Sequence, residues 1–462
     1  MGKLIAGVDS STQSVKIVVR DAFSGELVAE AKAPHPDGTE VDPESWWQAL
    51  QKVIAEVGGL EKISAISIAA QQHGMVALNK DGEVIRPALL WNDTRSAGAA
   101  IELNTEIRNI AAEVGSALVA AFTASKIRWF SQNEIDNSRK VAAFCLPHDY
   151  LSWKLSDSNN IADLVTDRSD ASGTGYFDSV NNKYVEKIFQ SAYLSDSKVI
   201  LPKVLGPNES TLKTVNGTLI GPGAGDNAAA ALGVGAELGD VVISLGTSGT
   251  AFSVSKTPTF DPSGEVAGFA DATGNFLPLV CTLNASRILD SANNILGSDF
   301  NELGELALKA EPGADGLTLL PYFEGERTPN RPNATGVLSG MTLSNTTRPN
   351  IARAMIEGML CGMADALSAL EKNGVLIKRI LLIGGGAKSV AVAKIASQIF
   401  GREILVPRPG EYVADGAAKQ AAWIATGQFP NWNLGEIKRY KELHSPEVLL
   451  KYRELRDRTE NW

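Results

Sequence analysis

Two hairpin patterns of the same kind occur in the two halves of this chain, and they restrict what it can fold into. Each consists of an apolar strand, a loop rich in hydroxyl groups and a second, alternating strand. The first hairpin carries the loop "DSSTQS" after residues 4–8, and the second is "DVVISLGTSGTAFSVSK", beginning at Asp240. This repetition indicates a duplicated architecture with one hairpin in each half.

The length and the order of the remaining patterns agree with two α/β domains. A chain of 462 residues exceeds what one hydrophobic core usually serves. Helical patterns alternate with strands, and a late strand "RILLIG" leads through a glycine turn into a helix over residues 390–400. We therefore predict an N-terminal domain over 1–235, a C-terminal domain over 240–430 and a charged helical appendage over 431–462.

Charge and cysteine usage exclude several classes of partner. A formal net charge of -10 argues against binding to nucleic acid or to an anionic membrane, each of which needs a basic face. Asp9 precedes any apolar run of signal-peptide length, and no run long enough to cross a membrane follows, so a cytoplasmic location is expected. The three cysteines lack CxxC spacing, which predicts core thiols.

The first hydroxyl-rich loop has the groups that a phosphate needs. Its backbone amides and the hydroxyls of Ser11 and Thr12 are donors, and Lys16 in the next strand adds a positive charge. Asp9 could hold a hydrated Mg²⁺. The alternative is an ordinary polar turn of a hairpin.

The second loop, "LGTSGT", repeats these features. Gly246 allows close backbone approach, and Thr247 and Ser248 are donors. Two such hairpins can hold a polyphosphate between them.

A third loop, "IGGGAKS", lies between a predicted strand and a predicted helix. It has neither the glycine before lysine of a P-loop nor the GxGxxG spacing of a dinucleotide fingerprint. Its glycines let the backbone lie against an aromatic base or a ribose, whereas the alternative is a tight turn. The candidate nucleotide-binding residues here are Gly385, Gly386, Ala387 and Ser389.

One carboxylate and one amide stand out in "GAGDNAAAALGVG", where Asp226 and Asn227 lie between glycines and a run of alanines. By itself this segment favours a helix N-cap at Asp226, since aspartate commonly starts helices.

Taken together, these elements resemble the FGGY carbohydrate kinases, which belong to the superfamily of actin, heat-shock chaperones and sugar kinases. Within that family the chain is most similar to the xylulose kinases, through "QQHGMV", "IRPALLWNDTR", "LPHDYLSWKL", "TDRSDASGTGYFD", "GAGDNAAAALG" and "ISLGTSG". The resemblance runs in order from residue 5 to residue 425. It implies two actin-like, ribonuclease H-like α/β domains with a cleft between them, which nucleotide and sugar together would close.

The resemblance also implies roles for individual residues. Asp226 matches the catalytic base that takes a proton from the attacking sugar hydroxyl, and Asn227 matches a sugar contact. Gln72 and His73 match sugar-binding residues, although many xylulose kinases carry Met where this chain has Gln72. A core histidine is the alternative for His73. Trp91 is a candidate lining residue of the sugar site or a packing residue. Asp170 and Ser172 are expected to fix a loop near the site.

The resulting hypothesis is ATP- and Mg²⁺-dependent phosphorylation of D-xylulose to D-xylulose 5-phosphate, with a homodimer as a further expectation. Another kinase of the family, acting on gluconate, ribulose or glycerol, is the first alternative. A different class, an actin-like or chaperone-like ATPase clamp, is the second, and Asp226 and His73 weigh against it because such a clamp needs no sugar base.

Overall fold

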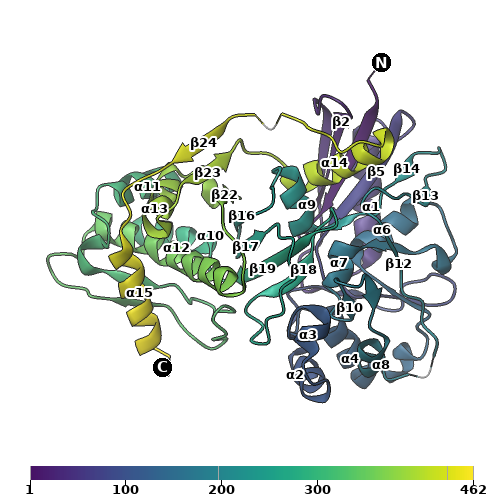
Figure 1. Cartoon of the computed structure of the whole chain (residues 1–462), viewed down its shortest axis with the longest axis horizontal. Coiled ribbons are helices and arrows are strands. Elements are labelled where there is room, and N and C mark those ends of the chain that lie inside the picture. Colours follow the sequence, from purple (N-terminus) through teal and green to yellow (C-terminus); the bar gives the residue numbers. More distant parts are fainter. Residues whose placement is uncertain (1, 196, 434, 461–462) are drawn as a thin grey trace. The chain divides into compact units, whose positions relative to one another are not determined.

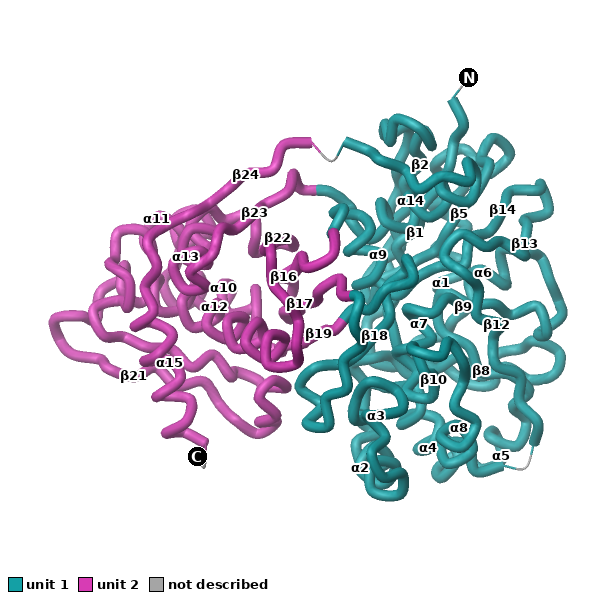
Figure 2. Tube along the Cα trace, in the orientation of Figure 1, with its two compact units in different colours: residues 1–236, 256–277, 410–433 teal, residues 237–255, 278–409, 434–462 magenta. Residues whose placement is uncertain are grey.

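The computed structural model describes residues 2–195, 197–433 and 435–460, and it forms two compact units (Figure 2). Unit 1 comprises residues 1–236, 256–277 and 410–433, and unit 2 comprises residues 237–255, 278–409 and 434–462. Each unit therefore combines segments that are far apart in the sequence. The expected domain limits stay a prediction, and positions 1, 196, 434, 461 and 462 of those domains lie outside the described residues.

Unit 1 is built around a mixed sheet with the strand order β13-β14-β5-β1-β2-β3, in which β15 also pairs with β5. The hairpin predicted at the start of the chain is confirmed as β1 and β2, which pair antiparallel, whereas β1 and β15 run parallel to β5. The strands are β1 (Leu4–Ser10), β2 (Ser14–Asp21), β3 (Leu27–Pro34), β5 (Ile63–Ala70), β13 (Leu212–Lys213), β14 (Leu219–Ile220) and β15 (Ala224–Gly225).

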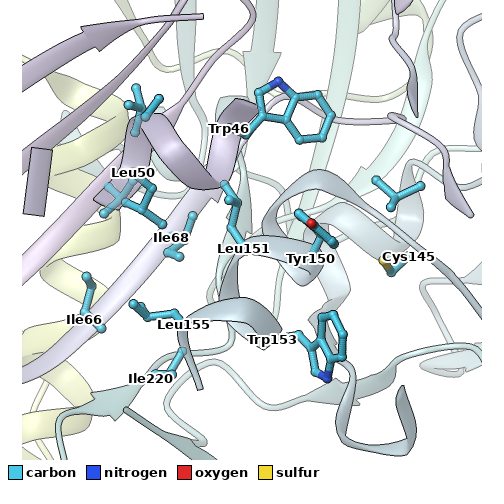
Figure 3. Packing of buried hydrophobic residues seen from close by; sticks show 14 of the residues in the cluster. Trp46, Leu50, Ile66, Ile68, Cys145, Tyr150, Leu151, Trp153, Leu155 and Ile220 are labelled. Atoms are coloured by element: carbon cyan, nitrogen blue, oxygen red, sulfur yellow. The ribbon is translucent and has the colours of Figure 1, made fainter. Parts of the chain in front are cut away.

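Alternation along β1 sends neighbouring side chains to opposite faces of this sheet. Ala6 and Val8 pack on one face with helices α1 (Pro43–Glu56) and α6 (Pro147–Leu155), in a core that includes Trp46, Leu50 and Leu151 (Figure 3). Ile5 belongs to a second cluster, on the other face, with alanines of helix α14 (Tyr412–Thr426). Both faces of the sheet are thus covered.

Helix α14 comes from the late part of the chain yet packs on the earliest strands. It lies against β1 and β5 and against helix α9 (Asp226–Gly233), as the yellow helix beside the purple strands in Figure 1 shows. A Cβ placed on Gly7 would lie 2.1 Å from the carbonyl oxygen of Ala414, so this contact leaves no space for a side chain. Gly233, the last glycine of "GAGDNAAAALG", permits a similar approach, since a Cβ there would lie 1.8 Å from the carbonyl oxygen of Tyr412.

Unit 2 contains the second predicted hairpin, confirmed as β16 and β17, within the strand order β19-β17-β16-β22-β23-β24. Strands β16, β22 and β23 are parallel, and β24 closes the edge antiparallel to β23. The segment after residue 431 thus contains a strand as well as the expected helix. The strands are β16 (Asp240–Leu245), β17 (Gly249–Ser253), β19 (Phe276–Thr282), β22 (Arg379–Ile383), β23 (Ile404–Pro407) and β24 (Ile437–Tyr440).

The hydropathy pattern predicts a helix of unit 2. The helix expected over residues 390–400 is confirmed as α13. The helices are α10 (Ser286–Leu296), α11 (Phe300–Leu308), α12 (Arg348–Lys372), α13 (Val390–Phe400) and α15 (Pro446–Arg458). None of the helices in the described part of the chain combines the length and hydropathy that a membrane crossing needs. The cysteines Cys145, Cys281 and Cys361 are free and buried.

Candidate active site

The ends of three strands bring the polar residues of unit 1 to one edge of its sheet. Asp9 in β1 is aligned with Ala69 in β5, and Gly225 in β15 is aligned with Ala70. Because β1 and β15 both run parallel to β5, the residues that follow these strands lie at the same edge. Ser11, Gln72 and Asp226, each predicted as a site residue, follow β1, β5 and β15 respectively.

Asp226 is the first residue of α9, and the N-cap position belongs to Gly225. The N-cap interpretation of Asp226 is therefore wrong, because the chain is still extended at residue 225 and helical from residue 226 onward. Its Oδ1 accepts hydrogen bonds from the backbone amide and the side-chain amide of Asn227, at 2.8 and 2.9 Å. Burial, with a further contribution from the negative charge of Asp9, raises the pKa of Asp226 to about 7.

Asp9 lies near the end of β1 with its carboxyl group buried, and its Oδ1 accepts a hydrogen bond from the hydroxyl of Ser11. Burial raises the pKa of Asp9 to about 6, against the lowering effects of Ser11 and Lys16. The charged form of Asp9 is thus less favourable than that of an exposed aspartate. Among the described residues no group of three or more His, Cys, Asp or Glu side chains is placed to hold a metal ion by itself.

The other predicted residues of the first hairpin have protein partners. The hydroxyl of Thr12 accepts a hydrogen bond from Nε1 of Trp91 at 2.9 Å, so these two candidates lie together. Lys16 forms an ion pair with Glu411, which directly precedes α14. A phosphate at Lys16 would therefore compete with this carboxylate.

Gln72 and His73 are both buried, and both are held by the segment that begins at helix α7 (Arg168–Ser172). The side-chain amide of Gln72 donates to the carbonyl oxygen of Ser169 at 3.0 Å. Nδ1 of His73 lies 2.6 Å from the carbonyl oxygen of Gly173. Since a carbonyl oxygen only accepts, Nδ1 carries the proton of this hydrogen bond.

The backbone of His73 is strained, with a φ of 70° in the left-handed region that non-glycine residues seldom adopt. Its ring packs against Phe122 and Phe269, with ring centroids 5.1 and 5.6 Å away. A strained backbone and a ring fixed on two sides orient the imidazole in one direction.

The nucleotide-binding candidates of unit 2 gather at one edge of its own sheet. Gly246, Thr247 and Ser248 form the turn between β16 and β17. The turn with Gly385 and Gly386 follows β22, which is parallel to β16. The two turns are packed together, since a Cβ on Gly384 would lie 2.6 Å from the carbonyl oxygen of Leu245.

Two of the candidates in the glycine turn, Ser389 and Ala387, already have structural roles within unit 2. Ser389 is the N-cap residue of α13, and its hydroxyl accepts from the amide of Val392 at 3.4 Å. Ala387 is buried. In contrast, the nearest described atom to a Cβ on Gly385 would be the carbonyl oxygen of Leu245 at 4.0 Å, and Gly385 is exposed. Gly385 is thus the position where a ligand can approach the backbone.

His148 was not among the residues predicted from the sequence. It lies beside α7, the helix whose Ser169 carbonyl oxygen holds Gln72. Its side chain is completely buried, 3.2 Å from Asp170. The signal that could have found it is the polar pair His148 and Asp149 directly after Pro147 in "LPHDYLSWKL".

Comparison with known proteins agrees with this arrangement. Residues 4–233 match the N-terminal domain of the FGGY family of carbohydrate kinases, and residues 241–425 match the C-terminal domain of that family. The chain is 42% identical to a xylulose kinase of Streptomyces coelicolor, over 92% of this chain and 89% of that protein.

Solved structures agree with it as well. The crystal structure of xylulose kinase from Bifidobacterium adolescentis is 45% identical, covers 98% of this chain and 99% of its own, and has a TM-score of 0.91. A gluconate kinase structure from Lactobacillus acidophilus is 25% identical, covers 98% of this chain and 96% of its own, and has a TM-score of 0.85. The expected fold class of two actin-like α/β domains is confirmed. The chain belongs to the FGGY family of carbohydrate kinases.

Proposed function

We propose that this carbohydrate kinase transfers the γ-phosphoryl group of ATP to the C5 hydroxyl of D-xylulose, giving D-xylulose 5-phosphate and ADP. The observation that carries the proposal is the meeting of a carboxylate of raised pKa, Asp226, with the sugar-site candidates at one sheet edge of unit 1. Identities of 42% and 45% to two xylulose kinases favour the ketopentose.

In the proposed step Asp226 acts as general base. Its carboxylate accepts the proton of the sugar hydroxyl while that oxygen forms a bond to the γ-phosphorus, and the bond from phosphorus to the ADP oxygen breaks. A carboxyl group whose pKa lies near 7 is poised to accept a proton at neutral pH. The backbone amide and the side-chain amide of Asn227 both donate to Oδ1 of Asp226 and fix its position.

Sugar recognition is proposed for Gln72, His73, Trp91 and Asn227. Nδ1 of His73 is bound to Gly173, and Nε2 is the ring nitrogen that we assign to a sugar hydroxyl. The side-chain nitrogen of Gln72 donates to the carbonyl oxygen of Ser169. Its side-chain oxygen is therefore the atom that we expect to accept from a sugar hydroxyl. Acceptors of this kind suit a polyhydroxylated substrate.

Membership of a carbohydrate kinase family makes ATP a substrate. Within unit 1 we propose Ser11, Thr12 and Lys16 as donors to its phosphates. Within unit 2 we propose residues 246–248 as phosphate donors and residues 385–387 with Ser389 as contacts of its adenosine. Mg²⁺ fits Asp9, because this cation commonly takes one or two carboxylates together with phosphate oxygens and water, and because Asp9 is a buried carboxyl group whose pKa burial raises despite Lys16. Bound there, Mg²⁺ would supply charge neutralisation on the phosphates.

A sugar screen tests the proposal. ADP release is measured at saturating ATP and Mg²⁺ with D-xylulose, L-xylulose, D-ribulose, xylitol, gluconate and glycerol, and kcat/KM is compared. D-xylulose is expected to have the highest value. A higher kcat/KM for gluconate, ribulose or glycerol would identify the protein as another kinase of the family. ATP turnover that is independent of every sugar would favour the ATPase clamp. The cytoplasmic location and the homodimer stay predictions.

A further inference from the structure

A cluster of buried ionisable groups lies beneath the sugar-site candidates of unit 1. Nε2 of His148, the second residue of α6, lies 3.3 Å from Asp149, 3.5 Å from Asp167 and 3.2 Å from Asp170. His148 and Asp170 are completely buried, and Asp149 and Asp167 nearly so. Burying four ionisable side chains is costly in free energy, so a cluster that serves packing alone would be better replaced by apolar residues.

The cluster is connected to the sugar-site candidates through helix α7. The carboxylate of Asp167 caps this helix by accepting from the amides of Ser169 and Asp170, at 2.8 and 3.0 Å. The hydroxyl of Ser169 accepts from the amide of Gly225 at 3.1 Å, directly before Asp226. The same short helix therefore contacts the start of α9.

Two further hydrogen bonds extend from this helix to the strand end at β5. The carbonyl oxygen of Ser169 holds the amide of Gln72, and the carbonyl oxygen of Gly173 holds His73. These are the two side chains proposed to bind the sugar. A shift of the α7 segment would move both of them.

His148 also lies against Gly223, directly before strand β15. A Cβ on Gly223 would lie 2.4 Å from Nδ1 of His148, and Gly223 has a φ of 85°. The imidazole ring thus fills the space between α7 and the turn that leads into β15. Within the described residues neither ring nitrogen of His148 makes a hydrogen bond of regular geometry, and neither do the two carboxyl oxygens of Asp170.

We propose that His148 and Asp170 form a positioning pair for sugar binding, which holds the α7 segment against the turn before β15. This inference rests on the proposed function, because its readout is the affinity for the sugar. The pair touches no reacting atom in our proposal and acts through Ser169 and Gly173.

The charges of the cluster support the pairing. Burial by itself lowers the pKa of His148, but Asp149, Asp167 and Asp170 outweigh it and raise that pKa to about 9. Burial raises the pKa of Asp149 to about 6 and that of Asp170 well above its ordinary value. A cationic imidazole therefore faces the three carboxyl groups, while burial favours the neutral form of Asp170.

Three variants test the pairing: His148→Leu, His148→Gln and, as a matched control, Glu357→Gln. Glu357 belongs to a buried ion pair of unit 2, with Arg353 Nε at 2.6 Å. We expect His148→Leu to raise KM for D-xylulose by about tenfold or more and to change KM for ATP less than about twofold. His148→Gln, which keeps a polar side chain able to donate to Asp170, should restore much of the sugar affinity. Glu357→Gln should leave both KM values unchanged.

Amide hydrogen exchange of the ligand-free proteins gives a readout without sugar. The amide of Gly225 and residues 169–173 should exchange faster in His148→Leu than in the parent, and at the parental rate in Glu357→Gln. Equal rises of both KM values, or unchanged exchange at Gly225, would overturn the proposal. If the parent does not phosphorylate D-xylulose, the proposed function fails, and the exchange rates alone decide the positioning role. If His148→Leu does not fold, the same two measurements on Asp170→Asn decide it.

Discussion

Gly416 of α14 faces the carbonyl oxygen of Ala229 of α9 so closely that a Cβ at residue 416 would lie 1.8 Å from that oxygen. The two helices approach with backbone against backbone, which glycine permits because it has no side chain. Since α9 begins at Asp226, this contact also determines where the proposed base lies.

Replacing Gly416 with alanine should destabilise the protein strongly, because neither backbone can move without disturbing the packing of α14 on β1. We expect a loss on the order of 2 kcal/mol or more in the free energy of unfolding, measured by denaturant titration. Gly98→Ala in helix α2 (Ala97–Glu106) is the control, since no described atom lies within 4 Å of its Cβ position. That variant should be as stable as the parent or more stable, and an equal loss in both variants would contradict the packing argument.

Asp226→Asn should separate catalysis from stability. The amide is nearly isosteric but cannot accept the proton, so we expect kcat to fall by about 10²-fold or more with the KM values for sugar and ATP little changed. Asp42→Ala provides the contrast, because Asp42 is the N-cap of α1 and accepts from the amide of Glu44. It should lose about 1 kcal/mol of stability and keep the parental kcat. A near-parental kcat in Asp226→Asn would show that Asp226 is not the general base.

The pH dependence of stability checks the raised pKa of Asp226 without any ligand. Its ordinary value is 3.8 and its folded value about 7, so the folded state binds a proton more tightly than the unfolded chain. Below about pH 4 both states are protonated and this group has no effect on stability. Between about pH 4 and 7 the parent should lose stability relative to Asp226→Asn, by an amount on the order of a few kcal/mol, and the difference should stay constant above pH 7. Urea titrations from pH 4 to 8.5 measure it, and a difference that does not vary with pH would contradict the assignment.

Gly385→Val should weaken ATP binding selectively. Residue 385 has a helical φ of -61° and an open Cβ position, so the protein itself tolerates the side chain while a nucleotide would meet it. We expect KM for ATP to rise by about tenfold and KM for the sugar to stay near the parental value. Gly386→Val is the comparison, because a Cβ there would lie 2.9 Å from the Cβ of Leu245 and should lower the melting temperature. Parallel rises of both KM values in Gly385→Val would indicate damage to the fold.

Gln72→Met tests the departure from the common family residue. Methionine cannot donate to the carbonyl oxygen of Ser169, so the variant loses one buried hydrogen bond, and we expect a cost of about 1 kcal/mol in stability. D-xylulose should remain a substrate with a moderately raised KM, while KM for ATP stays unchanged. The sugar screen described above, repeated on this variant, measures the change in preference. An unchanged KM for every sugar would exclude Gln72 from the sugar site.

The sequence by itself determined the local elements and the family. Alternating and helical hydropathy patterns predict the hairpins at Asp9 and Gly246 and the helix over residues 390–400, because these depend on neighbours in the chain. The motifs shared with FGGY kinases then indicate the fold class and Asp226 as the candidate base.

Tertiary structure alone decided the surroundings of these residues. It placed Gly225 and not Asp226 at the N-cap of α9, and it paired Lys16 with Glu411. It also brought His148 and Asp170 together from separate helices, a contact that no local pattern encodes. The physical reason is that strand pairing and burial join segments far apart in the sequence, and the raised pKa of Asp226 arises from that burial.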